Sequence, residues 1–303
     1  MGLLFDIIYG VSLPIMVMIA LGWFAQRWLS LDLPTLGRLH LNITLPCFII
    51  FHLATTEASL SSLGNIAWFT IVQFFVLFGL GWMAGRWLKT EHRHIPVIAI
   101  AIAFPNTGNY GIPLIELAFG PAYIAPQAVI MTLHSILIMS VGVLALTAGA
   151  GDWKASMKTS ISSPVIPAII IGLGLNVTDI VLPTPLLFPL EMMAGAFAPL
   201  ALLILGASLA TADRQDVWRL APPVMILRLL VAPVLTWVAC LAIGFDPVMT
   251  AFLVVNACGP VGVMLVIVCS QHENGRNVAA MSVFTTTLVA PFVATVALYL
   301  LRT

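Results

Sequence analysis

The sequence predicts an all-α, polytopic membrane protein with ten transmembrane helices, arranged as two inverted five-helix repeats. Three observations lead to this fold class. Hydrophobic residues make up 61% of the 303 residues and charged residues only 8%, whereas soluble domains average about 25% charged residues. The apolar residues fall into ten runs, each near the roughly 20 residues that one span needs. Prolines and glycines of the first half recur in the second half at a nearly constant distance.

The ten apolar runs are separated by short polar or proline-containing segments, which leaves no room for a sizeable soluble domain. The boundary between the sixth and seventh runs is the hardest to draw, because Pro183, Pro185 and Pro189 crowd it. The expected spans are 8–28, 36–55, 64–88, 95–119, 124–148, 162–178, 187–211, 217–243, 247–270 and 277–301.

The Lys and Arg residues predict the orientation in the membrane. Ten of the twelve fall in the loops that follow odd-numbered spans, and positively charged loops face the cytoplasm. We therefore expect a multi-pass protein of the cell's inner (plasma) membrane with both termini outside the cytoplasm. The net charge of zero offers no basic face for nucleic acid. The ten residues are Arg27, Arg38, Arg86, Lys89, Arg93, Lys154, Lys158, Arg214, Arg219 and Arg276.

An internal repeat divides the chain into 1–151 and 152–303. Five prolines and glycines recur in equivalent spans after 151 or 153 residues. Because each half has an odd number of spans, the second half sits upside down relative to the first. Such inverted repeats are typical of secondary transporters. The pairs are Pro14 with Pro167, Pro46 with Pro199, Pro96 with Pro247, Gly108 with Gly259 and Gly111 with Gly262.

The fourth and ninth spans are predicted to be broken near the middle of the membrane. Prolines, glycines and asparagines crowd residues 103–113 and 255–262, and each proline inside a helix costs roughly 3 kcal/mol. Irregular backbone at this depth survives only where protein or a water-filled cavity covers it. Matched breaks in the two halves of a transporter indicate a substrate site at the midplane.

The second half-helix of each broken span begins with unpaired N–H groups and about half a positive charge. A carboxylate could bind there, with help from the asparagine and threonine side chains. The alternative is a pair of kinked helices whose polar side chains only satisfy freed carbonyls. The candidate substrate-binding residues are Pro105, Asn106, Thr107, Gly108, Asn109, Gly111, Pro113, Asn256, Gly259, Pro260 and Gly262.

The chain resembles the auxin efflux carrier family over essentially its whole length. The most specific run is Pro-Asn-Thr-Gly-Asn-Tyr-Gly-Ile-Pro-Leu at 105–114. Leu-Asn-Ile-Thr-Leu-Pro at 41–46 and Pro-Leu-Ala-Leu-Leu-Ile-Leu-Gly-Ala-Ser-Leu at 199–209 add to it. The likeness is to the shorter bacterial members, which are similar to plant PIN auxin transporters but lack their long cytoplasmic loop. The ninth span matches less closely, with Asn256 where the first half has Pro105.

The resemblance implies a fold shared with sodium/proton antiporters and bile-acid symporters. It also implies a scaffold of spans 1, 2, 6 and 7, and a transport unit of spans 3–5 and 8–10 that moves like an elevator. Organic anions, either auxin-like or of the malate and malonate type, would bind where the broken spans cross. A homodimer formed through the scaffold is implied by the resemblance alone.

Six further polar residues within the spans are candidates for gating or coupling. Arg228 would attract an anion to the inner vestibule, or extend to the cytoplasmic headgroups. Glu116 would couple transport to protons, or lie solvated at the outer mouth. The others would line the gap between the subdomains or serve in packing and helix capping; they are Asn42, His52, Gln127 and His134.

No sequence motif for an enzyme, an ATPase or a metal site is present, so we expect neither catalysis nor a cofactor. A channel, or a membrane sensor that binds a ligand in the same cleft without moving it, is an alternative to a transporter. Coupling to protons, to sodium or to the membrane potential alone stays open at this stage.

Overall fold

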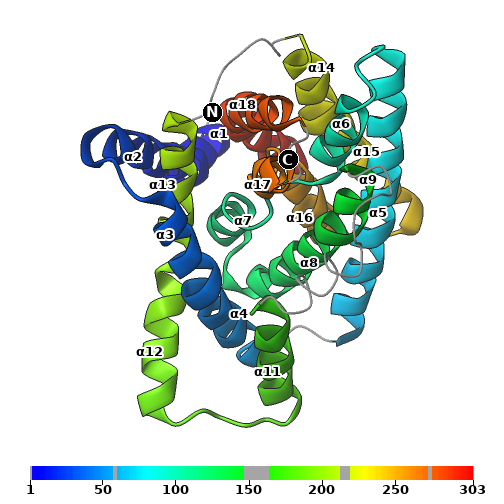
Figure 1. Ribbon diagram of the computed structural model, residues 1–303. Coiled ribbons are helices and arrows are strands. Elements are labelled where there is room, and N and C mark those ends of the chain that lie inside the picture. Colours follow the sequence, from blue (N-terminus) through cyan, green and yellow to red (C-terminus); the bar gives the residue numbers. More distant parts are fainter. Residues whose placement is uncertain (1, 57–59, 147–163, 212–218, 272–274, 303) are drawn as a thin grey trace.

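The computed structural model describes residues 2–56, 60–146, 164–211, 219–271 and 275–302. These residues are nearly all helical, and apart from one isolated bridge no strand occurs among them (Figure 1). Seven helices in the described ranges are long and apolar enough to cross a membrane: Leu4–Leu29, Leu33–Ala54, Ser62–Trp87, Pro121–Leu146, Thr184–Ala210, Ala221–Ile243 and Arg276–Leu301. The protein is therefore a polytopic membrane protein, as predicted.

The first half of the chain contains one long uninterrupted α-helix and several composite ones. Short π-helical or 3-10 turns interrupt the composite helices without ending them. The elements are α1 (Gly2–Ile7), η1 (Ile8–Ser12), α2 (Leu13–Leu29), α3 (Leu33–Leu39), η2 (His40–Thr44), α4 (Leu45–Ala54), α5 (Leu60–Trp87), α6 (His94–Ala103), α7 (Gly111–Phe119), η3 (Pro121–Tyr123), α8 (Ile124–Leu137), η4 (Ile138–Gly142) and α9 (Val143–Leu146).

The second half continues with α11 (Val165–Val177), α12 (Thr184–Gly195), α13 (Phe197–Ala210), α14 (Ala221–Ile226), η5 (Leu227–Val231), α15 (Ala232–Ile243), α16 (Pro247–Ala257), α17 (Met264–Gln271) and α18 (Arg276–Arg302). Each of the ten predicted ranges thus contains helix. The predicted loop residues Lys154, Lys158 and Arg214 lie outside the described residues.

Three of the π-helical turns end two residues before a proline. These prolines are Pro14, Pro46 and Pro233. A proline has no N–H, and its ring collides with the carbonyl four residues earlier. The chain responds with one wider turn, so that the Leu45 N–H bonds to the His40 carbonyl five residues back. Such turns often mark functional sites, and here they carry His40 and Arg228.

The broken helices α6 and α16 form the interior of the molecule. Every residue of α6 from Ile95 to Ala103 is buried, and so is every residue of α16 from Thr250 to Ala257. A helix that is apolar on all sides needs protein around its whole circumference. Helices α5 and α18 both pack against α6, and α15 and α18 pack against α16.

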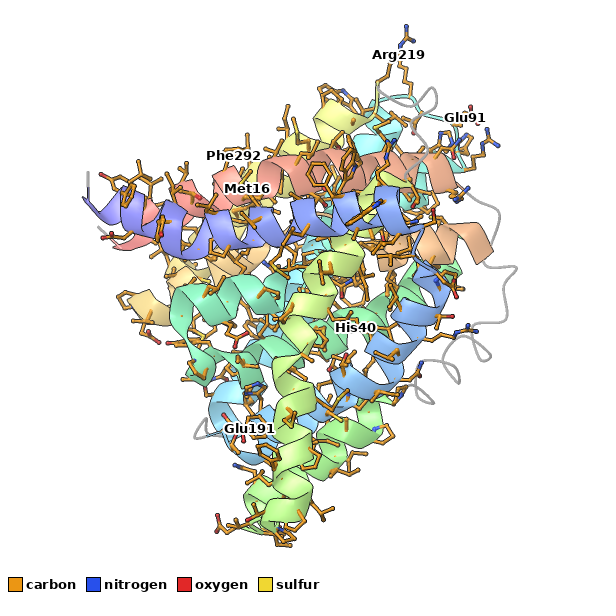
Figure 2. All side chains as sticks on the ribbon, turned by 90° about the vertical axis from the view of Figure 1, so that its left-hand side faces the viewer. Met16, His40, Glu91, Glu191, Arg219 and Phe292 are labelled. Carbon is orange, nitrogen blue, oxygen red and sulfur yellow. The ribbon has the colours of Figure 1, made fainter. Side chains whose placement is uncertain are left out.

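Helix α13 crosses α2 at backbone contact (Figure 2). A Cβ atom added to Gly22 would collide with the Leu203 carbonyl, and one added to Gly206 would collide with the Ile19 carbonyl. Small residues of this kind let membrane helices approach closely. Helix α4 packs in turn against α11 and α12.

Candidate functional site

The two breaks predicted from the sequence cross each other as one paired structure. After α6 and α16 end, Pro105 and Val261 form an antiparallel bridge. The Asn106 N–H donates to the Pro260 carbonyl at 2.7 Å, and the Gly262 N–H donates to the Phe104 carbonyl at 3.0 Å. We call residues 104–110 and 258–263 the crossover. Backbone N–H and carbonyl groups that have no helical partner where α6 and α16 end are thus hydrogen-bonded to each other across the crossover.

Close approach at the crossover depends on Gly262. A Cβ atom at this position would overlap the ring of Phe104, so only glycine allows the two strands of the bridge to lie this near. The Val261 N–H is bonded outside the bridge, because it donates to Oγ1 of Thr286 on α18 at 3.0 Å. The crossover is therefore held by α18 as well as by its own pairing.

Arg228 lies beneath the crossover and is only 1% exposed. Its guanidinium donates to three backbone carbonyls: Nη1 to Ile102 at 2.7 Å, Nη2 to Ala257 at 2.8 Å, and Nε to Gly259 at 3.0 Å. These carbonyls belong to the C-terminal ends of α6 and α16, each of which carries about half a negative charge. One buried cation therefore compensates two helix ends.

The placement of Arg228 differs from both positions considered for it from the sequence. The side chain does not line the cavity described below, and it does not extend to the surface. The reason is the π-helical turn η5, within which Arg228 lies and donates into the helix ends. A buried charge needs such a complete set of partners.

Gln127 on α8 joins the two breaks a second time. Its Nε2 atom donates to the Thr107 carbonyl at 2.8 Å and to Oδ1 of Asn256 at 3.0 Å. Gln127 is fully buried and Asn256 is 3% exposed. Both amides are therefore used inside the protein, and neither lines the gap between helices in which we had expected Gln127.

A cavity of about 1150 Å³ reaches the crossover. It is lined by residues of α3, η2, α4, the start of α11 and α13, together with residues of the crossover, α8, η4, α17 and the start of α18. Six of the eleven predicted substrate-binding residues line it: Pro105, Asn106, Thr107, Gly108, Asn109 and Gly262. The other five are buried without lining it: Gly111, Pro113, Asn256, Gly259 and Pro260.

Two polar atoms in the cavity wall have no hydrogen-bond partner within the described residues. They are Nδ2 of Asn106, on the crossover, and Nε2 of His40, on the opposite wall. Their residues are 6% and 2% exposed. Buried polar atoms normally have partners, since leaving one unpaired costs about 1–3 kcal/mol. Each of these two atoms therefore lacks a hydrogen-bond partner that a polar ligand could supply.

Sequence comparison decides the family. A family model described as "Membrane transport protein" matches residues 7–162 and 151–298. The chain belongs to this membrane transport protein family, that of the auxin efflux carriers.

Two relatives of this transport protein are similar over nearly their whole lengths. A Rhizobium meliloti protein named "Putative malonate transporter" is 24% identical over 97% of this chain and 96% of its own. A Methanothermobacter thermautotrophicus protein named "Uncharacterized transporter" is 22% identical over 92% of this chain and 93% of its own length. Family and names point to a transporter rather than an enzyme.

Four further residues of the transport protein had been singled out from the sequence. Asn42 lines the cavity and donates through Nδ2 to the Arg38 carbonyl at 2.8 Å. His52 packs against the rings of Phe48 and Phe51, and His134 is buried against Phe74 and Phe104. Glu116 is exposed on α7. The last three do not line the cavity.

Sequence reasoning missed His40 in this transport protein. The ring stacks on Phe197 of α13 with 4.6 Å between the ring centroids, and it lies between α13 and the α3–α4 helix (Figure 2). The one available signal was Pro46, which forces the π-helical turn that begins at His40. Nothing in the sequence says which way that turn points the side chain.

Proposed function

We propose that the protein is a secondary transporter of organic anions, with the carboxylate bound at the crossover. The observation that carries this proposal is Asn106, a residue that lines the cavity and whose buried Nδ2 atom has no partner in the described residues. An amide N–H in a largely apolar cavity is a suitable donor for a carboxylate oxygen, which can only accept when ionised.

Charge around the crossover supports an anionic substrate. Arg228 compensates the negative ends of α6 and α16, whereas within the described ranges no charged side chain is paired with the positive N-terminal ends of α7 and α17. Asn109 before α7 and Val263 before α17 both line the cavity. An anion beside Asn106 would supply the missing negative charge.

The proposed topology has ten membrane crossings in two inverted repeats, 1–151 and 152–303, with both termini outside the cytoplasm of the inner membrane. It is supported by helix in each predicted range. A second support is the pairing of the two breaks at matched positions of the two halves.

The proposed mechanism is an elevator, in which a transport unit (spans 3–5 and 8–10) slides along a scaffold (spans 1, 2, 6 and 7). Helix packing supports this division, because α2 packs mainly on α13 and α4 mainly on α11 and α12, whereas α5 packs on α6 and α8. The cavity lies between these two groups. Ser12 and Thr295 join them through a contact of 2.5 Å between their hydroxyl oxygens. We further propose a homodimer formed through the scaffold.

The proposed substrates are small carboxylates of the malonate and malate type or auxin-like acids. The name of the Rhizobium relative includes malonate, and the cavity of about 1150 Å³ has space for molecules of this size.

Uptake into proteoliposomes tests the proposal. The panel contains malonate, malate, succinate, a monocarboxylate and an indole carboxylate, each measured as labelled exchange against the same unlabelled anion. Saturable exchange of at least one anion, absent from protein-free vesicles, is the expected result. Thermal stabilisation by an anion without any exchange would instead identify a sensor, and would overturn the transporter proposal.

A further inference from the structure

We propose that His40 binds the carboxylate together with one proton, so that transport is coupled to protons. This inference rests on the proposed function and adds the coupling ion to it. It assigns His40 to the wall opposite Asn106, as the second polar contact of the same ligand.

The hydrogen bonds of Thr44 determine which nitrogen of His40 carries the proton. Oγ1 of Thr44 lies 2.9 Å from the His40 carbonyl and 3.0 Å from Nδ1 of the His40 ring. The hydroxyl has a single proton. If that proton points to the carbonyl, then Nδ1 must carry its own proton and donate it to Oγ1. In this arrangement Nδ1–H donates to the Thr44 hydroxyl, and the hydroxyl donates to the His40 carbonyl. Only the tautomer protonated at Nδ1 makes both contacts hydrogen bonds.

A neutral ring protonated at Nδ1 has a lone pair at Nε2. His40 lines the cavity, and its Nε2 atom is buried and has no hydrogen-bond partner among the described residues. A carboxylate oxygen also carries only lone pairs, so the two atoms repel each other when they meet. A single proton between them turns the contact into a strong, charge-assisted hydrogen bond.

The proton can arrive either on the His40 ring or on the carboxylate, and in both cases one proton is bound for each ligand. It binds the ring to give an imidazolium that donates to the carboxylate, or it arrives on the carboxylic acid, which donates to the neutral ring. In both cases one proton, taken from water and returned to it, enters the site with the ligand and leaves with it; the covalent bond that forms and later breaks is the N–H bond of the imidazolium or the O–H bond of the acid. Asn106 needs no proton, because its amide already donates.

His40 is well placed to contact a ligand that rests on the crossover. Its ring is fixed on one side by Phe197 and at Nδ1 by Thr44. The side chain of Asn109, from the crossover, lies beside the His40 ring and interacts with it, and both residues line the cavity. The ligand would therefore touch both walls, and proton uptake would accompany closure of the gap between them.

No other charged group in the described residues is paired with the His40 ring. The helices packed against η2 carry Arg38 on α3, Cys47 and His52 on α4, and Glu191 on α12, while α13 has no titratable side chain. The cavity adds Arg276, and the crossover adds buried Tyr110. None of them makes a hydrogen bond or ion pair with the ring within the part of the chain described.

Labelled malonate in proteoliposomes tests the coupling. Exchange at equal pH measures carrier activity, and accumulation under a gradient of one pH unit, alkaline inside and with the membrane potential clamped at zero, measures coupling. With one proton per substrate, wild-type protein accumulates malonate up to about tenfold. Protein-free vesicles give the background of passive diffusion of the acid.

The decisive variant is His40→Gln, whose amide donates to a carboxylate without a proton. We expect the ratio of accumulation to exchange to lose its pH-driven component in this variant, whatever its exchange rate, whereas the matched variant His52→Gln keeps the wild-type ratio. Accumulation that persists in His40→Gln, or wild-type exchange without any accumulation, overturns the inference while leaving the transporter intact. Absence of wild-type exchange overturns malonate transport itself, and the inference with it.

Thr44 provides a second variant should His40→Gln fail to fold. Thr44→Val removes the acceptor of the Nδ1 proton, so the ring can carry its proton at Nε2 and donate to the carboxylate directly. Accumulation per exchange should fall in Thr44→Val and return in Thr44→Ser. Full accumulation in Thr44→Val overturns the inference. A role of Thr44 limited to helix stability would not change the ratio of accumulation to exchange.

Discussion

Nε2 of Gln127 donates to Oδ1 of Asn256 at 3.0 Å, across 129 residues of sequence. The same nitrogen donates to the Thr107 carbonyl at 2.8 Å. The amide of Gln127 on α8 therefore connects the interrupted fourth span to the interrupted ninth span through hydrogen bonds. Together with the Pro105–Val261 bridge, it makes the crossover a single unit that can keep its shape while helices around it move.

Replacing Gln127 with Leu should damage transport more than stability. The substitution leaves the Asn256 and Thr107 oxygens without their donor, at about 1–3 kcal/mol for each buried group. We expect a lower melting temperature and at least a tenfold loss of anion exchange, measured on the same purified protein. Gln73→Leu is the matched control, since Gln73 donates to Thr236 away from the cavity. Equal exchange in the two variants would contradict a special role for Gln127.

Replacing Arg228 should reduce the amount of folded protein, so that any loss of transport follows from the loss of folding. Arg228→Met keeps much of the side-chain volume but leaves three buried carbonyls without donors and two helix ends without a counter-charge. We expect little folded protein by size-exclusion chromatography. Arg228→Lys keeps the charge but loses the planar set of donors, and it should lie between Met and wild type. A Met variant as stable as wild type would disprove this account of the buried arginine.

The contact between α2 and α13 leads to a prediction about packing. Gly206→Ala places a methyl group against the Ile19 carbonyl, so the two helices must separate. A drop in melting temperature is expected, measured by differential scanning fluorimetry in detergent. Gly174→Ala is the control, because a Cβ atom there meets nothing within 4 Å, and alanine favours the helix α11. Equal melting temperatures for the two variants would show that α2 and α13 are not held this closely.

The breaks of the fourth and ninth spans were predictable because proline and glycine act locally. Pro105, Gly108 and Pro260 disfavour continuous helix wherever they stand. The recurrence of Gly108 as Gly259, 151 residues later, indicated that the two breaks form a matched pair. The partners of Arg228 and Gln127 were not predictable in this way. Their acceptors lie between 20 and 129 residues away, and no periodicity in the sequence encodes such contacts.

His40 escaped prediction for a related reason. A helical wheel assumes a constant rotation per residue, but the π-helical turn before Pro46 changes that rotation at His40 itself. His52 and His134 looked equally good from the sequence, and three-dimensional packing alone separates them from His40. Conversely, the position of residues 105–109 in the cavity lining could be expected without such information, because an interrupted helix exposes its backbone and short polar side chains together.

Anion exchange by Asn106→Ala tests the central claim most directly. The variant removes the buried, unpaired Nδ2 atom of a residue that lines the cavity. The control is Asn65→Ala, at an exposed position on α5 outside the cavity. We predict that exchange of the anion carried by wild type falls at least tenfold in Asn106→Ala, with an unchanged melting temperature, and is normal in Asn65→Ala. Wild-type exchange in Asn106→Ala would contradict a carboxylate site at the crossover.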